Sequence, residues 1–174
     1  MRPPPLDLRD SVLAAWETNN RVTAYLIENV PAPLWSATVP GLPSRTIRAI
    51  GAHLHNSRCS WIKTLGQEHG ITVPVQVDRR TITRRQLVAA LTRSSRGIAA
   101  VLELGCSRGG RVPPSQAYTW RNLSFDVGHV LTYFVAHEGH HRGQIVMAAR
   151  QLDCRLPIAV TGELWQWRTR QRKA

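Results

Sequence analysis

The sequence has few acidic residues, few cysteines and no long apolar run. Its 174 residues include 11 Asp and Glu against 23 Lys and Arg, which gives a net charge of +12. The three cysteines form no Cys-x-x-Cys pair, which fits a reducing compartment better than a disulfide scaffold. No apolar stretch approaches the ~20 residues of a membrane span, and the N-terminus lacks the apolar segment of a secretory signal. We therefore expect a cytoplasmic protein without a membrane partner.

Length and composition are typical of one globular domain. Hydrophobic residues make up 43% of the chain and charged residues 20%, close to ordinary globular usage. A chain of this length commonly forms a single core. We expect one domain over residues 1–174, ending in a short basic tail at 168–174.

Four long segments repeat apolar side chains at helical spacing, and stretches rich in Pro, Gly and Ser separate them. The predicted helices cover residues 11–29, 45–67, 84–104 and 124–152. An extended linker is expected over 71–82, where a proline argues against a central strand, and a long crossover loop over 107–122. Four long helices without a convincing strand pair predict an all-α fold, a four-helix bundle with long crossover loops.

Local signals mark where these helices begin. Asp7 or Asp10 suits the start of the first helix and Ser44 that of the second. Thr83 and Gln86 match a capping box at the start of the third. Beyond the fourth helix, we expect the tryptophans near the C-terminus to pack back on the bundle and the basic residues after them to lie free.

Six of the seven histidines fall on two of the predicted helices. At ~100° per residue, His137 and His141 lie about 40° apart, in a sector shared with Val130, Gln144 and Ala148 that we interpret as the core-facing stripe. A lone histidine is more often a hydrogen-bonded core residue than a ligand. Two imidazoles one turn apart on an inward face can converge on one metal ion, and bundle cores commonly hold such sites. This pair therefore favours a metal site.

A third ligand could come from the second helix. His53 and His55 lie about 160° apart on it, so both cannot face one centre. The apolar stripe of that helix passes between them, and periodicity alone leaves both candidates open. His129 and His140 point away from the sector of the histidine pair, and we expect them beside the site or at the surface.

Residues 137–141 also satisfy H-E-x-x-H, the zinc-protease pattern in which the glutamate is the general base. The longer pattern with a further Gly and His is absent, because Gln144 and Met147 stand at those positions. A downstream carboxylate ligand would have to be Glu163, in a segment with no predicted helix. A zinc protease is therefore only a remote alternative, and we expect Glu138 to form a salt bridge or to support the site.

Residues 136–145, AHEGHHRGQI, resemble the signature helix of the DinB/YfiT-like family of damage-inducible metalloenzymes, which is unrelated to the DNA polymerase of the same name. Residues 52–62, AHLHNSRCSWI, are similar to that family's first motif. Leu156-Pro157 and residues 164–167, LWQW, resemble its C-terminus. The resemblance covers nearly the whole chain, and H-x-x-x-H-R-G-Q is much more specific than H-E-x-x-H.

The resemblance implies a four-helix bundle, often dimeric, in which three histidines hold a divalent metal. The ligands it implies are His53, His137 and His141, and it is the resemblance that selects His53 over His55. Zinc is the expected metal, with nickel or iron as alternatives. Relatives include transferases and isomerases that use low-molecular-weight thiols, so the resemblance also implies a small-molecule substrate and a homodimer.

Three histidines leave a fourth coordination position open, as in catalytic zinc sites. A divalent ion there lowers the pKa of a bound water or thiol. The sequence thus predicts a metal-dependent enzyme that activates water or a low-molecular-weight thiol for transfer or hydrolysis, with its catalytic residues unassigned. Gln144 could orient water or bond within the bundle, whereas Arg58 and Arg142 are expected to pair with acids between helices.

Arginines clustered around the third predicted helix support an alternative function, the binding of a polyanion. They are Arg79, Arg80, Arg84, Arg85, Arg93 and Arg96. Such a patch is the usual electrostatic footprint of nucleic-acid binding, but no recognisable reading module accompanies it. A non-catalytic basic protein that binds nucleic acid or another polyanion is the alternative, and a non-catalytic metal-binding protein is a third candidate.

Overall fold

A computed structural model describes residues 7–113, 115–116 and 122–171 of the chain. The long helices are α1 (Leu8–Glu28), α2 (Ile47–Gly66), α3 (Arg84–Ser107) and α4 (Val127–Gln151). The short elements are α5 (Ile158–Thr161), α6 (Trp167–Gln171) and the 3-10 turns η1 (Ala32–Leu34), η2 (Gln67–His69) and η3 (Gly162–Trp165). Within the described residues there is no strand, only two isolated bridges. The predicted all-α class is confirmed.

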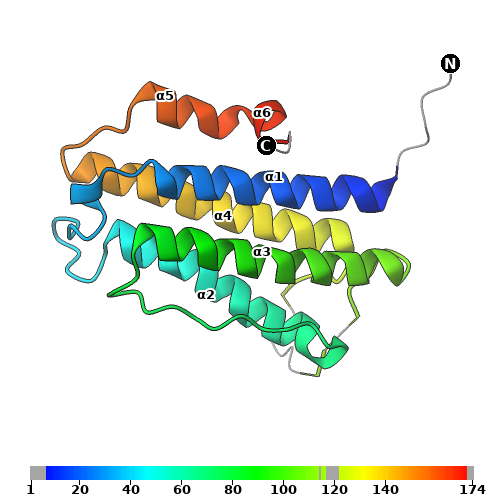
Figure 1. Cartoon of the computed structure of the whole chain (residues 1–174). Helices are drawn as coiled ribbons and strands as arrows, with labels where there is room; N and C mark the ends of the chain where they lie inside the picture. The colour runs from blue at the N-terminus through cyan, green and yellow to red at the C-terminus, as the bar shows by residue number, and fades with distance from the viewer. Residues whose placement is uncertain (1–6, 114, 117–121, 172–174) are drawn as a thin grey trace, which may run out of the picture.

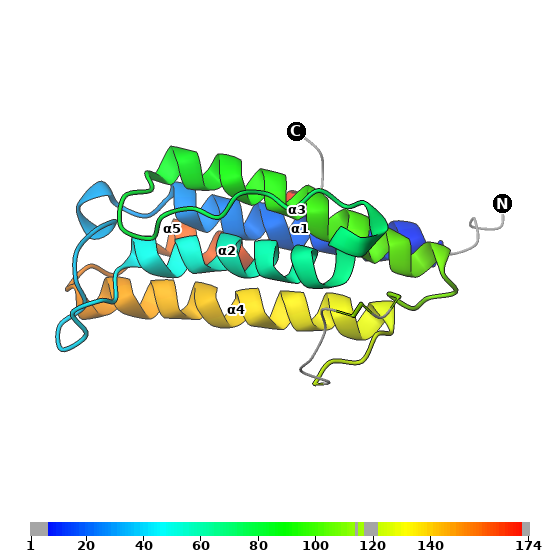
Figure 2. The ribbon, with the colours of Figure 1, turned by 90° about the horizontal axis from the view of Figure 1, so that it is seen from below.

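The long helices form a four-helix bundle in which chain neighbours are not always spatial neighbours (Figures 1 and 2). α2 packs on α3 and α4, and α1 packs on the same two helices from the other side. α1 and α4 run in one direction, whereas α2 and α3 run in the other (Figure 1). None of the helices in the described part of the chain is long and apolar enough to cross a membrane.

Because α2 and α3 are parallel, the chain must return along the bundle between them. Residues 70–83, hereafter the crossover segment, do this in extended form along α2 and α3 (Figure 2). α3 ends and α4 begins at the same end of the bundle, so the crossover that we expected over 107–122 is wrong (Figure 1); residues 114 and 117–121 of that segment lie outside the described part of the chain. The long crossover of the fold is therefore the linker that the sequence marked over 71–82.

The helix starts agree with the sequence signals at α1 and α3 and differ at α2. Asp7 caps α1, and Thr83 with Gln86 forms the complete capping box of α3. α2 is capped by Thr46, whose side chain accepts from the N–H of Ala49, and not by Ser44 as predicted. A bridge between Thr38 and Thr46 holds the chain extended up to Thr46, so the helix begins at Ile47 and not at the predicted residue 45.

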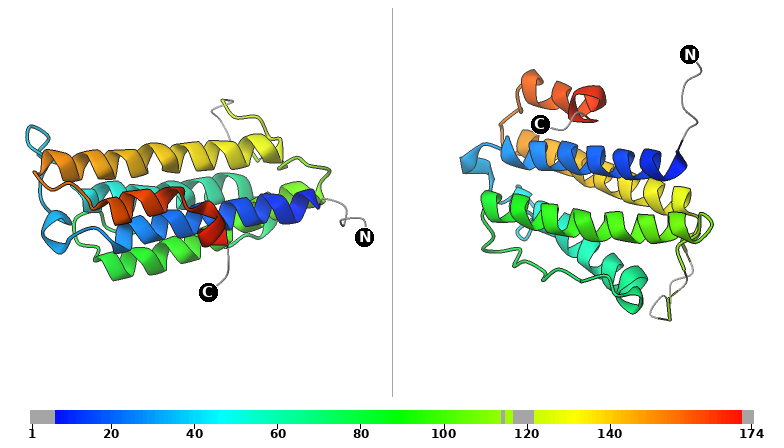
Figure 3. Two further views of the ribbon diagram at one scale, coloured as in Figure 1. Left: turned by 90° about the horizontal axis from the view of Figure 1, so that it is seen from above. Right: turned by 45° about the vertical axis from the view of Figure 1, so that its right-hand side comes forward.

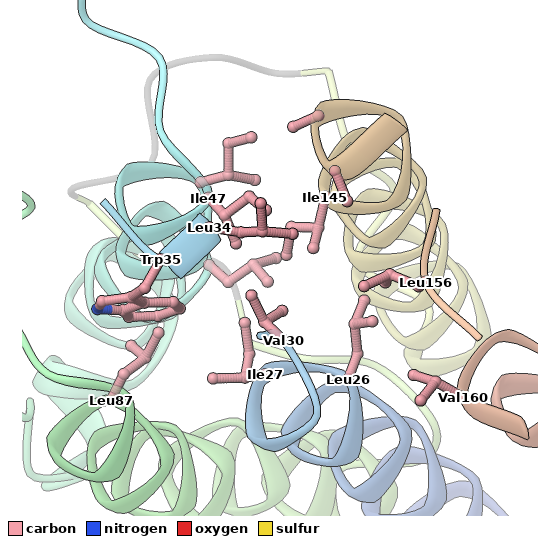
Figure 4. Packing of buried hydrophobic residues seen from close by; sticks show 14 of the residues in the cluster. Leu26, Ile27, Val30, Leu34, Trp35, Ile47, Leu87, Ile145, Leu156 and Val160 are labelled. Carbon is pink, nitrogen blue, oxygen red and sulfur yellow. The ribbon is translucent and has the colours of Figure 1, made fainter. Parts of the chain in front are cut away.

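Two apolar clusters fill the bundle, one toward each end, and a polar layer lies between them. The first cluster joins the end of α1 to the starts of α2 and α3 and includes Leu26, Ile27, Trp35, Ile47 and Leu87 (Figure 4). The second surrounds Trp16, Trp61 and Phe134. The layer between them consists of buried polar side chains from all four long helices: Asn19, Thr23, His55, Arg58, Ser94 and Glu138.

The C-terminal elements α5, η3 and α6 lie along α1 (Figure 3). Trp165 is 83% exposed, so the expectation that these tryptophans pack on the bundle is wrong for this residue. The prediction of a free basic tail is wrong at Arg170, whose guanidinium lies 3.8 Å from the ring centroid of Tyr25 and 2.9 Å from Glu163. That contact also places Glu163 in a helical turn, away from the histidines. Residues 172–174 of the tail lie outside the described residues.

Candidate metal centre

Three histidines from two helices converge on the flank of the bundle between α2 and α4. α2 supplies His53, and α4 supplies His137 and His141 one turn apart. One ring nitrogen of each lies within 4.8 Å of the other two, and the Nε2 atoms of His137 and His141 are 3.2 Å apart. The centroid of the His53 ring lies 5.5 Å from that of His137 and 4.6 Å from that of His141. These are the three histidines that the family resemblance selected.

The three rings are half-buried and do not lie in the core. We placed the sector of His137 and His141 on the core-facing stripe, but the buried residues of α4 centre about 60° further round the helix, toward Glu138. Those buried residues are Val127, Val130, Phe134, Glu138, Ile145, Ala148 and Ala149. The histidines therefore stand at the border between core and solvent, where a ligand can reach them.

Burial and neighbouring charges keep the three imidazoles neutral. Burial, followed by the charges of His141 and Arg79, lowers the pKa of His53 to about 4. Burial and the neighbouring His141 also lower the pKa of His137. Burial lowers the pKa of His141, although its hydrogen bond with Gln144 opposes the shift. Neutral imidazole is the metal-binding form, so the three rings are ready to act as ligands at neutral pH.

Gln144 fixes the tautomer of His141. Its side-chain oxygen lies 2.8 Å from Nδ1 of His141, while its nitrogen donates to Nε2 of His140 at 2.7 Å. With the proton of His141 on Nδ1, the lone pair on its Nε2 is directed to the side of His137. Proteins orient metal-ligating imidazoles with such outer hydrogen bonds. Of the two roles that the sequence left open for Gln144, the structure shows bonding within the bundle.

The crossover segment brings an arginine to the site. The Nη2 atom of Arg79 donates a hydrogen bond to Nδ1 of His53 at 2.9 Å. The backbone of Val77, two residues before Arg79, is hydrogen-bonded to the side chain of Asn56. That side chain donates to the Val77 carbonyl at 2.9 Å and accepts from the Val77 N–H at 2.8 Å. Asn56 therefore fixes the position from which Arg79 reaches His53.

His55, the other candidate for the third ligand, hydrogen-bonds within the bundle and does not join the cluster. It is fully buried, and its two nitrogens lie 3.0 Å from the Ser94 hydroxyl and 3.0 Å from the Val75 carbonyl. The ring thus ties the crossover segment to α3. Cys59 lies 3.3 Å from Nε2 of His55, but burial raises the pKa of its thiol to about 11. The thiol stays protonated at neutral pH, so we assign no nucleophile there.

Glu138, the glutamate of the H-E-x-x-H string, belongs to the polar layer of the bundle. It is 2% exposed, and its carboxylate accepts from Arg58 at 2.6 Å, from Thr23 at 2.8 Å and from Asn19 at 2.9 Å. Burial alone would raise the pKa of Glu138, but Arg58, Thr23 and Arg142 hold it below its ordinary value. The salt bridge expected for Glu138 is confirmed. A buried carboxylate that is paired with Arg58 and does not line the pocket beside the histidines is not placed to serve as a protease base.

The two arginines of the motifs complete this layer. Arg58 also donates to the Asn20 side chain and to the Leu91 carbonyl, at 2.8 and 2.9 Å. Arg142 donates at 2.8 Å to both Asn19 and Thr23. The interhelical pairing with an acid that we expected is confirmed for Arg58, whereas Arg142 reaches α1 through Asn19 and Thr23 and its carboxylate neighbour, Glu138, lies on its own helix. Together these contacts join the four long helices.

A pocket of about 340 Å³ adjoins the histidines. It lies between the start of α2, the crossover segment and α4. Its lining residues are Ser44, Arg45, Ala49, Ile50, His53, Arg79, His141 and Gln144. Among the described residues, no carboxylate lines it. The site therefore combines neutral ring nitrogens with two positive charges.

Sequence reasoning placed most of these groups but missed several. Arg79 was grouped with the basic face of the third helix, and Arg45 was not considered. Asn19 and Thr23 were also missed, although a signal was present. They follow Trp16 at the three- and four-residue spacing of the apolar face of α1, where polar side chains need buried partners. As expected, His129 and His140 lie outside the cluster and are exposed.

The donor set fits a tetrahedral divalent ion. Zinc–nitrogen distances of about 2.0–2.1 Å place ligand nitrogens about 3.3 Å apart. The Nε2 atoms of His137 and His141 already have nearly this separation, at 3.2 Å. At this distance the two rings can share one N–H···N hydrogen bond, or both lone pairs can bind one cation without a large movement. Three such ligands would leave one position for a further ligand.

Comparison with protein families gives one match. The model of the DinB family matches residues 6–171, a range that contains all four long helices and the three converging histidines. A search of curated proteins returns no match to the chain. The family match and the histidine geometry rest on different observations, since one concerns the whole sequence and the other the placement of three side chains.

Proposed function

The chain belongs to the DinB family, and from this premise we propose that it is a metal-dependent enzyme whose divalent ion is held by His53, His137 and His141. One observation carries the proposal: three neutral imidazoles meet at the border of the core, beside a pocket. A purely structural site would have no need of that adjoining space, because structural zinc sites are closed by four protein ligands.

The residues around the histidines support a binding site of fixed shape. Gln144 holds the His141 ring in the ligating tautomer, and the buried Glu138 network fixes α4 against α1 and α2. A bound divalent ion would supply Lewis acidity, lowering the pKa of a water or thiol that enters the open position. The pocket residues would admit and orient the reacting molecule. We propose zinc as the metal, with nickel or iron as alternatives, and a low-molecular-weight thiol or water as the nucleophile.

The experiment is a metal analysis of untagged protein by mass spectrometry. We expect about one divalent ion per chain in the wild type, and its loss in His53→Ala, His137→Ala and His141→Ala. His129→Ala is the matched control, because it removes an exposed histidine from α4 that lies outside the cluster. Circular dichroism of each variant checks that the helices are retained.

The reaction is tested with the metal-loaded protein. Conjugation of a low-molecular-weight thiol to a chromogenic electrophile measures transfer, and cleavage of an activated ester measures hydrolysis. Activity that is lost with the metal and restored on reloading supports the enzyme. Wild-type protein that neither carries metal nor takes up added zinc, nickel or iron would overturn the proposal.

One observation keeps the polyanion-binding alternative in view. Arg85, Arg93 and Arg96 are exposed on the outer face of α3. Arg84 is not free in the same way, because it donates to the Val30 carbonyl at the end of α1. Binding to mixed-sequence DNA that falls steeply with added salt would favour this alternative. We favour the enzyme, since the three converging histidines adjoin a pocket and no recognisable nucleic-acid-reading module accompanies the basic face in the described part of the chain.

Four further expectations from the sequence stay predictions. They are a single domain, a homodimer, a cytoplasmic location and damage-inducible expression. Size-exclusion chromatography with light scattering tests the homodimer, and limited proteolysis tests the single domain.

A further inference from the structure

Two arginines face the pocket without carboxylate partners in the described part of the chain. Arg45 lies just before α2 and Arg79 lies in the crossover segment, and both line the pocket. Both are exposed, and the charges of both act on His53. Guanidinium groups bind carboxylate and phosphate with short, charge-assisted hydrogen bonds. The pocket therefore has the charge and donor groups of an anion site.

The hydrogen bond that Arg79 makes is incompatible with metal binding by His53. Arg79 can only donate, so Nδ1 of His53 must accept, and a neutral imidazole has one lone pair. If Nδ1 is the metal ligand, that lone pair is taken. If Nε2 is the ligand, Nδ1 carries the proton and cannot accept. In either case Arg79 must leave His53 when His53 binds a metal.

The crossover segment keeps Arg79 near the site after that release. Asn56 fixes the backbone at Val77, and Asp78 closes the following turn by accepting from the N–H of Arg80 at 2.8 Å. The guanidinium can move, but its backbone cannot move far. The guanidinium therefore stays within reach of the pocket that Arg79 and Arg45 both line.

Resting on the proposed function, we propose that Arg45 and Arg79 select a small substrate or thiol that carries a carboxylate or phosphate group, and that Arg79 passes from His53 to this anion when the metal binds. The anion lies in the pocket, next to the position where the reacting atom meets the metal. The two binding events are then coupled, because the metal releases the arginine that the anion uses.

The test compares two thiols of equal length, 3-mercaptopropionate and 3-mercaptopropan-1-ol, on the cobalt-loaded protein. Cobalt(II) is a spectroscopic substitute for zinc, and its absorption changes when a thiolate binds. We expect the carboxylate thiol to bind at least about tenfold more tightly in the wild type. In Arg45→Met and Arg79→Met this preference falls, and in the double variant it disappears, because affinity for the carboxylate thiol falls by a larger factor than affinity for the alcohol thiol.

A second measurement follows cobalt affinity itself. Arg79→Met is expected to bind cobalt several-fold more tightly than the wild type, because the variant removes both a competing hydrogen bond and a nearby positive charge. Arg80→Gln is the matched control, since Arg80 lies on the same segment but does not line the pocket. It should change neither cobalt affinity nor the preference between thiols.

Other outcomes separate the two proposals. Equal affinity for the two thiols in the wild type, or a preference that survives in the double variant, overturns the anion site and leaves the metal enzyme standing. Protein that does not bind cobalt overturns the proposed function. In that case propionate against propan-1-ol, titrated onto the metal-free protein with ¹⁵N-arginine resonances as readout, still decides whether Arg45 and Arg79 bind an anion. No shift of those resonances by propionate would overturn the inference as well.

Discussion

Glu138 and His137 are neighbours on α4, yet their side chains have very different surroundings. The carboxylate of Glu138 is buried and takes hydrogen bonds from side chains on α1 and α2. The ring of His137 is half-buried, and the nearest polar atom to its Nε2 is the equivalent nitrogen of His141. A rotation of ~100° along one helix thus separates a buried, hydrogen-bonded carboxylate from a ring nitrogen that is accessible to a ligand.

This difference divides the residues of the H-x-x-x-H-R-G-Q string between two roles. The histidines and Gln144 form the site and its outer support. Arg142, together with Glu138, belongs to the polar layer that holds three helices together. Titratable residues next to each other in sequence can therefore be told apart by burial and by whether their hydrogen-bonding capacity is filled.

The largest effect should come from opening the buried network. Glu138→Ala leaves Arg58 buried without its carboxylate, and removing one partner of a buried ion pair costs about 3–5 kcal/mol. Urea unfolding followed by circular dichroism measures the loss. The double variant Arg58→Met/Glu138→Leu should recover part of it, because no buried charge of that pair remains. A loss below about 1 kcal/mol in Glu138→Ala would show that the layer is not structural.

Changing the other face should reverse the pattern. His141→Ala is expected to weaken zinc binding more than about 100-fold, since even outer partners of a ligand change affinity by 10–100-fold. Because the ring is half-buried, the unfolding free energy of the metal-free protein should change by less than about 1 kcal/mol. Competition with a chromophoric chelator gives the affinity. Equal zinc affinity in variant and wild type would contradict the assignment of His141.

Substitutions of Gln144 test whether its hydrogen bond to His141 contributes to metal binding. Gln144→Leu removes the acceptor that holds the proton of His141 on Nδ1, so zinc affinity should fall about 10–100-fold. Gln144→Glu keeps an acceptor at the same distance along the side chain and should restore most of the affinity. Similar losses in the two variants would mean that Gln144 acts through its volume and not through the hydrogen bond.

The smallest effect concerns pH. The pKa of His53 in the folded protein is about 4, against 6.5 for an ordinary histidine. Between these values the unfolded chain binds more protons than the folded one, so stability falls as pH is lowered from 6.5 to 4 and is constant for this group above 6.5. Urea unfolding of the metal-free protein at several pH values should show this slope. His53→Ala should make it shallower, and an unchanged slope would rule out His53 as a contributor.

The sequence predicted the helices well because their apolar spacing and end signals are local properties. It predicted Ser44 as the cap of a helix starting at residue 45, whereas Thr46 is the cap, because the extended pairing of Thr38 with Thr46 depends on residues that meet only in the folded chain. The parallel course of α2 and α3 was likewise hidden, although the extended, proline-containing linker pointed to a long connection. Local patterns indicate which segments are helical, but the direction in which each helix packs depends on tertiary contacts.

At the site, the histidine pair on α4 followed from its spacing, whereas the third ligand did not. His53 and His55 lie on opposite edges of the apolar stripe of α2, so the choice depends on which edge meets α4. In the structure His53 faces α4, whereas His55 hydrogen-bonds to Ser94 and to the crossover segment. Arg79 was beyond prediction for the same reason, because its contact with His53 joins residues 26 positions apart.

The course of the crossover segment also bears on how this protein could be re-engineered. The side chains of Asn56 and His55 hydrogen-bond to main-chain atoms of Val77 and Val75, and Val77 and Ile82 pack against the apolar core, so the path of the segment does not depend on the exposed side chain of Arg79. The helices that carry the histidines are built separately from this wall of the pocket. Exposed side chains of the segment such as Arg79 can thus be substituted to change which small molecule the pocket binds, while the helical bundle stays unchanged.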